Sequence, residues 1–152
     1  MRLFYNSCHF YAFRDRRIEL TAVLHIIKYN KEKVNGRRGC VYRIALLTDK
    51  KQDSESYVRV IKDYCASRSQ FPLVERYLEQ EVFFKEIQKN VPDIVFLTLP
   101  GVAGLNAAEH LHSLFPRCGI IWCSNLDFSL HAFRLRIVYF FMEPIEEQKI
   151  RE

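Results

Sequence analysis

A repeated pattern constrains this chain more than any other feature: short apolar runs that end in a polar residue alternate with segments of helical periodicity. The apolar runs occupy five places, at residues 43–48, 71–77, 94–98, 119–124 and 138–142. Helical patterns lie between them and after the last, at residues 54–66, 79–90, 106–115, 127–134 and 145–152. Such alternation predicts an α/β fold in which helices make right-handed crossovers between the strands of a parallel sheet. The run at 71–77 is less apolar and has Pro72 near its start, which favours an edge strand.

Three of the helical patterns also predict a cap or an apolar face. Asp53 or Ser54 is suited to cap the N-terminus of the helix at 54–66. The apolar face of that helix is expected to hold Tyr57, Val60, Ile61, Tyr64 and Cys65. In the helix at 79–90 the inward residues are expected to be Val82, Phe83 and Ile87. In the helix at 106–115 they are expected to be Ala107, Ala108, Leu111 and Leu114.

Charge is divided unevenly along the chain. Residues 1–40 hold nine Lys or Arg against three Asp or Glu, a net charge of +6, whereas residues 41–152 hold fourteen against fifteen, a net charge of −1. A charged run with two glycines, at 35–39, separates the two parts. We therefore predict a basic extension over residues 1–40, either disordered or with a weak helix at 16–33, and one domain over residues 41–152 whose last helix is truncated.

The chain lacks the signals of several protein classes. No run approaches the 18 or so apolar residues of a membrane helix, and the N-terminus has no signal-peptide cleavage site. Five scattered cysteines suit reduced thiols, so we expect a cytoplasmic protein. The spacings of Cys118 with Cys123 and of His110 with His112 do not suit a shared metal ion.

Polar residues at the ends of the predicted strands are the candidate functional residues. They are Thr48 with Asp49, Thr98, Ser124 and Glu143. Ligands of open parallel sheets bind at the carboxyl ends of the strands, so these side chains are expected at one edge of the sheet. The simplest interpretation is structural: the three hydroxyls satisfy nearby backbone groups. Asp49 and Glu143 are weak candidates for a divalent metal site.

The same positions resemble those of bacterial response-regulator receiver domains. Residues 92–98 (PDIVFLT), with Pro100, Gly101 and Gly104, resemble the third strand of that family and the turn after it. There the residue at Thr98 is the aspartate that accepts the phosphoryl group. Residues 44–49 resemble the first strand, with the acidic pocket of the family at Thr48 and Asp49.

The remaining strands extend the resemblance. Residues 120–124 resemble the fourth strand, with its hydroxyl switch residue at Ser124. Residues 139–144 resemble the fifth, with the aromatic switch residue at Phe140, the family's lysine at Glu143 and a cis-proline at Pro144. Residues 132–136 are most like receivers that precede LytTR-type DNA-binding domains. The resemblance implies a flavodoxin-like (βα)5 fold with a five-stranded parallel sheet in the order 2-1-3-4-5.

The departures from the family pattern affect the residues that carry out phosphoryl transfer in that family. Phosphoryl transfer to a carboxylate uses an anionic nucleophile, an oxygen-ligated Mg²⁺ and a fixed cation. Thr98 supplies a hydroxyl without an adjacent base, Thr48 replaces one acidic metal ligand, and Glu143 replaces the lysine. The turn from Thr98 to Pro100 is also two residues shorter than the usual spacing. We therefore expect no cofactor, Mg²⁺ included, and no enzymatic activity.

These features together predict a pseudo-receiver of a two-component system. It would act in signal transduction and transcription regulation through protein contact rather than aspartate phosphorylation. A homodimer or a partner protein is expected on the face of the fourth helix, fifth strand and fifth helix, around residues 127–136 and 145–151. DNA contact is expected only through a missing output domain, and no membrane contact is expected. Two alternatives stay open: a response regulator phosphorylated on an unconventional residue, and a nucleic-acid binder that uses the basic extension.

Overall fold

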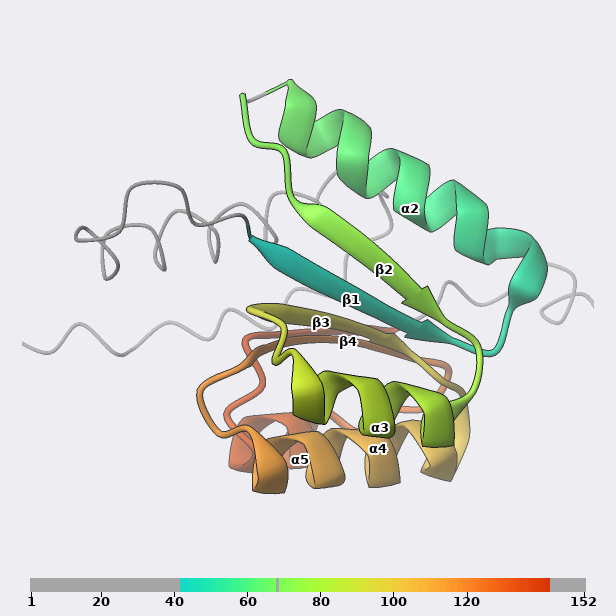
Figure 1. The fold of residues 1–152 in the computed structure, drawn as a ribbon. Coiled ribbons are helices and arrows are strands. Elements are labelled where there is room, and N and C mark those ends of the chain that lie inside the picture. Colours follow the sequence, from blue (N-terminus) through green and yellow to red (C-terminus); the bar gives the residue numbers. More distant parts are fainter. Residues whose placement is uncertain (1–41, 68, 143–152) are drawn as a thin grey trace, which may run out of the picture.

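Five parallel strands form one sheet with helices on both faces (Figure 1) in the computed structural model, which describes residues 42–67 and 69–142. The strands lie in the order β2-β1-β3-β4-β5, and every neighbouring pair is parallel. In chain order the elements are β1 (Arg43–Thr48), α2 (Lys51–Ala66), β2 (Leu73–Tyr77), α3 (Gln80–Lys89), β3 (Ile94–Thr98), α4 (Gly101–Leu114), β4 (Gly119–Ser124), α5 (Ser129–Arg134) and β5 (Tyr139–Met142). The predicted flavodoxin-like fold and strand order are confirmed.

Burial explains why the apolar runs became strands. All residues of β3 and β4 are buried, as are five of the six residues of β1, which suits strands covered on both faces. Side chains alternate between two apolar clusters. One cluster joins the sheet to α3, α4 and α5 and includes Leu47, Leu97 and Trp122. The other joins it to α2 and includes Leu46 and Ile121.

Asp93 aligns the amino ends of three strands. Its carboxylate accepts a hydrogen bond from the Arg43 N–H (2.8 Å), and its own N–H donates to the Arg43 carbonyl (2.9 Å). The Gly119 N–H donates to the Asp93 carbonyl at 3.0 Å. Since β1, β3 and β4 start level and have similar lengths, their polar carboxyl ends meet at one edge of the sheet.

Helix boundaries and faces differ from the prediction in several places, and Leu114, which was expected to face inward, is 39% exposed. The first helix begins at Lys51, so Asp53 and Ser54 lie inside its first turn, where the Ser54 hydroxyl donates to the Lys51 carbonyl at 2.7 Å. α4 begins at Gly101 rather than at residue 106. Val82 is 47% exposed instead of buried, and the half-buried Phe84 packs against the core beside Phe83.

Several predictions lie outside the described residues: the weak helix at 16–33, the helix from 145, and the roles of Glu143 and Pro144. Among the described residues, none of the helices is both long enough and apolar enough to cross a membrane.

Candidate functional site

Two threonines occupy the carboxyl ends of the central strands. Thr48 of β1 and Thr98 of β3 are neighbours in the sheet register, and both are buried. The Thr98 hydroxyl donates to the Leu47 carbonyl oxygen at 3.4 Å. The Thr48 hydroxyl oxygen accepts a hydrogen bond from the Lys50 N–H at 3.2 Å. Both hydroxyls therefore bond to the backbone, as the structural interpretation of the sequence predicts.

Two polar side chains at the end of β4 and in the loop after it accept hydrogen bonds from backbone N–H groups. The Ser124 hydroxyl oxygen accepts the Leu126 N–H at 3.1 Å, which closes a turn directly after the strand. The Asn125 side-chain carbonyl accepts the Gly101 N–H, at the first residue of α4, at 2.7 Å. A helix N-terminus is an anion-binding feature because its first N–H groups have no partner within the helix. Asn125 takes one of those N–H groups of α4.

Aromatic rings hold the position of Phe140 on β5. Trp122, the adjacent residue on β4, contacts the Phe140 ring edge-on, with ring centroids 5.1 Å apart. Trp122 also stacks on Phe128, at 5.5 Å and an interplanar angle of 12°. The half-buried Phe140 ring thus packs against the α3–α5 side of the core.

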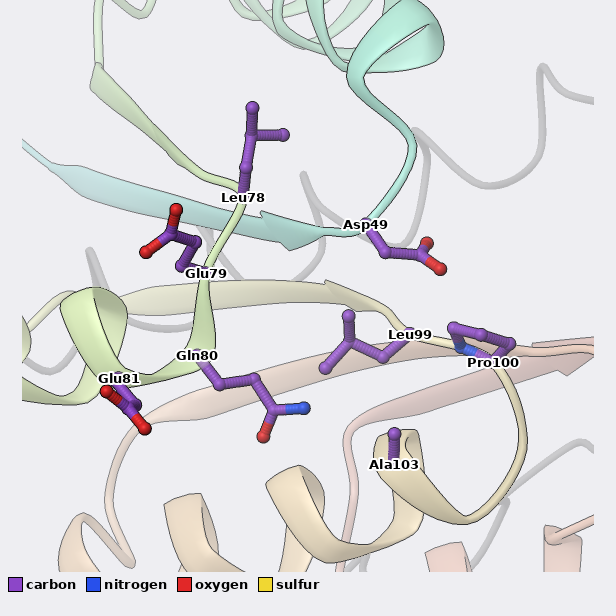
Figure 2. A pocket seen from close by; sticks show the side chains of 8 residues that line it. All are labelled: Asp49, Leu78, Glu79, Gln80, Glu81, Leu99, Pro100 and Ala103. Carbon is purple, nitrogen blue, oxygen red and sulfur yellow. The ribbon is translucent and has the colours of Figure 1, made fainter.

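A pocket of about 450 Å³ opens at the same edge of the sheet, between the ends of β1, β2 and β3. Leu99, Pro100 and Ala103 form part of its wall. Its acidic residues are Asp49, Glu79 and Glu81, but their carboxylates point away from one another (Figure 2). Sequence reasoning missed the wall contributed by Leu78 to Glu81, although these residues directly follow β2 and the strand-end rule applies to them as well.

Among the described residues, the donor set at this edge does not fit the Mg²⁺ that the resemblance implies. Mg²⁺ requires nearly ideal octahedral oxygen geometry and is usually held by one or two carboxylates. Of the described residues at the ends of β1 and β3, only Asp49 supplies a carboxylate, and Thr48 and Thr98 direct their hydroxyls to the backbone. No group of three His, Cys, Asp or Glu residues within the described ranges could hold a metal ion.

The predicted site residues are brought only partly together. Thr48, Asp49 and Thr98 lie on neighbouring strand ends, as expected. Ser124 and Phe140 lie on β4 and β5. The Ser124 hydroxyl accepts a hydrogen bond from its own loop, and the Phe140 ring packs against the aromatic core. Among the described site residues, the three hydroxyls are therefore satisfied by the backbone, and Asp49 is the one carboxylate.

Comparison with known proteins tests the fold independently. No protein-family model matches the sequence, and no curated protein is significantly similar to it. Solved structures do match. A CheY-like receiver domain protein from Methanospirillum hungatei JF-1 has a TM-score of 0.57 at 15% identity, over 74% of this chain and 89% of that one. A LuxR-family response regulator from Aurantimonas sp. SI85-9A1 has a TM-score of 0.57 at 21% identity, over 74% and 81%.

The REC domain of AraT, a response regulator from Geobacillus stearothermophilus, matches at a TM-score of 0.54 and 18% identity, over 74% of this chain and 88% of that one. This chain has the receiver-domain fold. At such identities the likeness establishes the fold alone, and the chemistry of this chain must be argued from its own residues.

Proposed function

We propose that this receiver is a pseudo-receiver, which acts by protein contact and not by aspartate phosphorylation. Thr98 is the observation that carries the proposal. It ends β3, it is only 3% exposed, and its hydroxyl donates to the Leu47 carbonyl. A neutral hydroxyl becomes a nucleophile only beside a base, and this one faces a backbone carbonyl that cannot take its proton.

Two further features support the proposal. The first N–H of α4, at Gly101, donates to Asn125 and is not free to bind a phosphoryl oxygen. The oxygen donors around Asp49 do not suit Mg²⁺, which neutralises the developing charge in phosphoryl transfer. A receiver without this chemistry has the role of a binding module rather than an enzyme.

The proposal includes a cellular setting. We place the protein in the cytoplasm, in signal transduction and transcription regulation, and closest to receivers of LytTR-type regulators through residues 132–136. Contact with DNA would then require a separate output domain.

Incubation with acetyl phosphate and a magnesium salt tests the chemical part of the proposal. We expect the intact mass to stay unchanged, because among the described residues the Thr98 hydroxyl faces a backbone carbonyl rather than a base, and no group of three possible ligands could hold a metal ion. Thr98→Val is the matched variant, since it removes the hydroxyl at nearly constant shape. A stable gain of one phosphoryl group in the parent protein, lost in Thr98→Val, would establish phosphorylation at an unconventional residue instead.

The contact surface that we propose is the α5 face, defined by Leu126, Leu130, Phe133 and Val138. These side chains belong to α5 or lie next to it in sequence, and each is between 48% and 61% exposed. Leu130 and Phe133 are three residues apart and therefore lie on one side of the helix. Exposed apolar side chains that gather in one place are typical of protein interfaces. The second half of the predicted surface, residues 145–151, lies outside the described residues.

Introduction of negative charge into this apolar surface tests the α5 face. We expect the parent protein to dimerise in sedimentation-velocity runs, and we expect Leu130→Glu with Phe133→Glu to yield a monomer, because the interface would bury two unpaired carboxylates. Val82→Glu on α3 is the control, since Val82 is also exposed but lies on another helix. A parent protein that stays monomeric would limit the α5 face to other partners, and equal dissociation by Val82→Glu would place the interface elsewhere.

A further inference from the structure

Within the described residues, β2 is an edge strand of the sheet and pairs only with β1. The Leu73 N–H donates to the Tyr42 carbonyl at 2.7 Å, so the backbone groups of Leu73 and of every second residue after it face β1. The backbone N–H and C=O groups of Val74 and Arg76 therefore point away from the sheet. A row of such groups is a template for one more strand.

A groove with a volume of about 460 Å³ runs between this edge and α2, which lies alongside β2 on one face of the sheet (Figure 1). Val74 packs against the apolar cluster that joins the sheet to α2, and the Arg76 guanidinium donates to Ser54 Oγ at 3.1 Å, so both side chains project to the α2 side. Together with them, residues of α2 at helical spacing line the groove: Glu55, Val58, Arg59, Lys62 and Asp63. A strand added to β2 would place alternate side chains in this groove.

The charge of the groove favours an acidic occupant. Arg76 is paired with Glu55 at 3.3 Å. Arg59 and Lys62 are exposed and have no ion-pair partner among the described residues, and the remaining carboxylate of the groove is that of Asp63. An acidic side chain of an added strand would be attracted to the two cations, whereas a basic one would be repelled.

Proline and charged side chains often protect an edge strand from pairing, and β2 has both at hand. Pro72, however, precedes the strand and leaves the outward N–H groups of Val74 and Arg76 in place. The Arg76 guanidinium is held against α2 by Ser54 and Glu55. The edge can therefore accept a strand.

We propose that β2 and α2 form a docking site for an extended acidic segment of a partner protein, which adds to β2 as an antiparallel strand. In this binding mode the main-chain hydrogen bonds provide affinity and the groove selects the side chains. Antiparallel pairing is the more stable arrangement per residue. It directs each peptide residue that bonds to Val74 or Arg76 toward the α2 side, where Arg59 and Lys62 lie. The site is independent of the proposed α5 face, because β2 and β5 lie at opposite edges of the sheet.

Fluorescence anisotropy with the parent protein tests the proposal. The probe is a fluorescein-labelled peptide in which glutamate and valine alternate, and its charge control has lysine in place of glutamate. We expect saturable binding of the first peptide and at least tenfold weaker binding of the second. N-methylation of the glutamate amides is expected to abolish binding, because these nitrogens face β2 when the glutamates face the groove. N-methylation of the valine amides is expected to preserve it.

Charge reversal on the protein tests the same contact from the other side. We expect Arg59→Glu with Lys62→Glu to weaken binding of the glutamate peptide at least tenfold. Lys85→Glu with Arg117→Glu reverses two exposed cations outside the groove and is expected to leave the affinity unchanged. Because all four positions are exposed, we expect circular dichroism to show the parent fold in both variants.

Several results would overturn the proposal. Absence of binding by the parent protein would show that the edge does not accept such a peptide, and equal binding of the two methylated peptides would exclude strand addition. Loss of binding on methylation of valine instead of glutamate would exclude the antiparallel arrangement. Equal weakening by the two protein variants would reduce the effect to net charge. An affinity that rises as the protein is diluted would identify a second copy of the chain as the occupant.

Discussion

Replacement of Trp122 by alanine is expected to lower the free energy of unfolding by about 3 kcal/mol. Trp122 is fully buried on β4, where it stacks on Phe128 and contacts Phe140 edge-on. Truncation of a buried Trp costs about 3–5 kcal/mol through lost burial and the cavity that remains. Its indole N–H has no hydrogen-bond partner in the part of the chain that the structure describes. An unpaired buried donor costs about 1–3 kcal/mol of desolvation, and the substitution removes that cost. The expected loss of unfolding free energy therefore lies near the lower end of the range for a buried Trp.

Trp122→Phe separates these two contributions. It keeps an aromatic ring against Phe128 and removes the N–H, so we expect a loss below about 1.5 kcal/mol. Urea unfolding followed by circular dichroism measures both variants, since Trp122 is the sole tryptophan and both substitutions remove the fluorescence signal. A Trp122→Phe variant as unstable as Trp122→Ala would show that the N–H forms a stabilising hydrogen bond.

The Trp122 contacts bear on the proposed function as well as on stability. The sequence resemblance predicts that Phe140 corresponds to the aromatic switch residue of receivers, and its ring is held against Trp122 and the core. The Ser124 hydroxyl is likewise held by the Leu126 N–H. With both side chains engaged, the pseudo-receiver that we propose would have one conformation to present to partners, with no phosphorylation to change it.

The sheet could be predicted from the sequence because its signal is local. Each central strand is a continuous apolar run, and a run of four to six such residues between polar ends has few other stable arrangements in an α/β chain. The strand order was predicted from the resemblance to receiver domains, which rests on several motifs together rather than on any one of them. The candidate residues at the ends of β1, β3 and β4 followed from the same strand boundaries.

Helix starts and the pocket could not be predicted with equal success, because they depend on contacts distant in sequence. Glycines are weak helix formers, so Gly101 and Gly104 argued for a turn before residue 106. In the fold they belong to α4, whose packing against β3 and β4 outweighs their low propensity. The pocket wall at Glu79 and Glu81 arises from the pairing of β2 with β1, which no local pattern of charges indicates.

The second large effect is expected at Gly104, where alanine should destabilise the protein by about 1–3 kcal/mol. In an exposed helix interior, Gly→Ala stabilises by up to about 1 kcal/mol, so the expected sign is the opposite of the usual one. A Cβ atom on Gly104 would lie 2.4 Å from the Leu99 carbonyl oxygen and 3.2 Å from the Trp122 indole nitrogen. Because the first of these atoms is backbone, the clash can be relieved only by movement of α4 or of the two-residue loop after β3.

Asn106→Ala is the matched control, because Asn106 is an exposed position of the same helix. We expect this substitution to stabilise the protein by a few tenths of a kcal/mol, since alanine is the better helix former. Urea unfolding of the two variants compares them directly. A Gly104→Ala variant that is stabilised as much as Asn106→Ala would mean that α4 does not approach Leu99 this closely. If Gly104→Ala is destabilised as expected, close packing of α4 on the loop after β3 accounts for the short turn beyond Thr98.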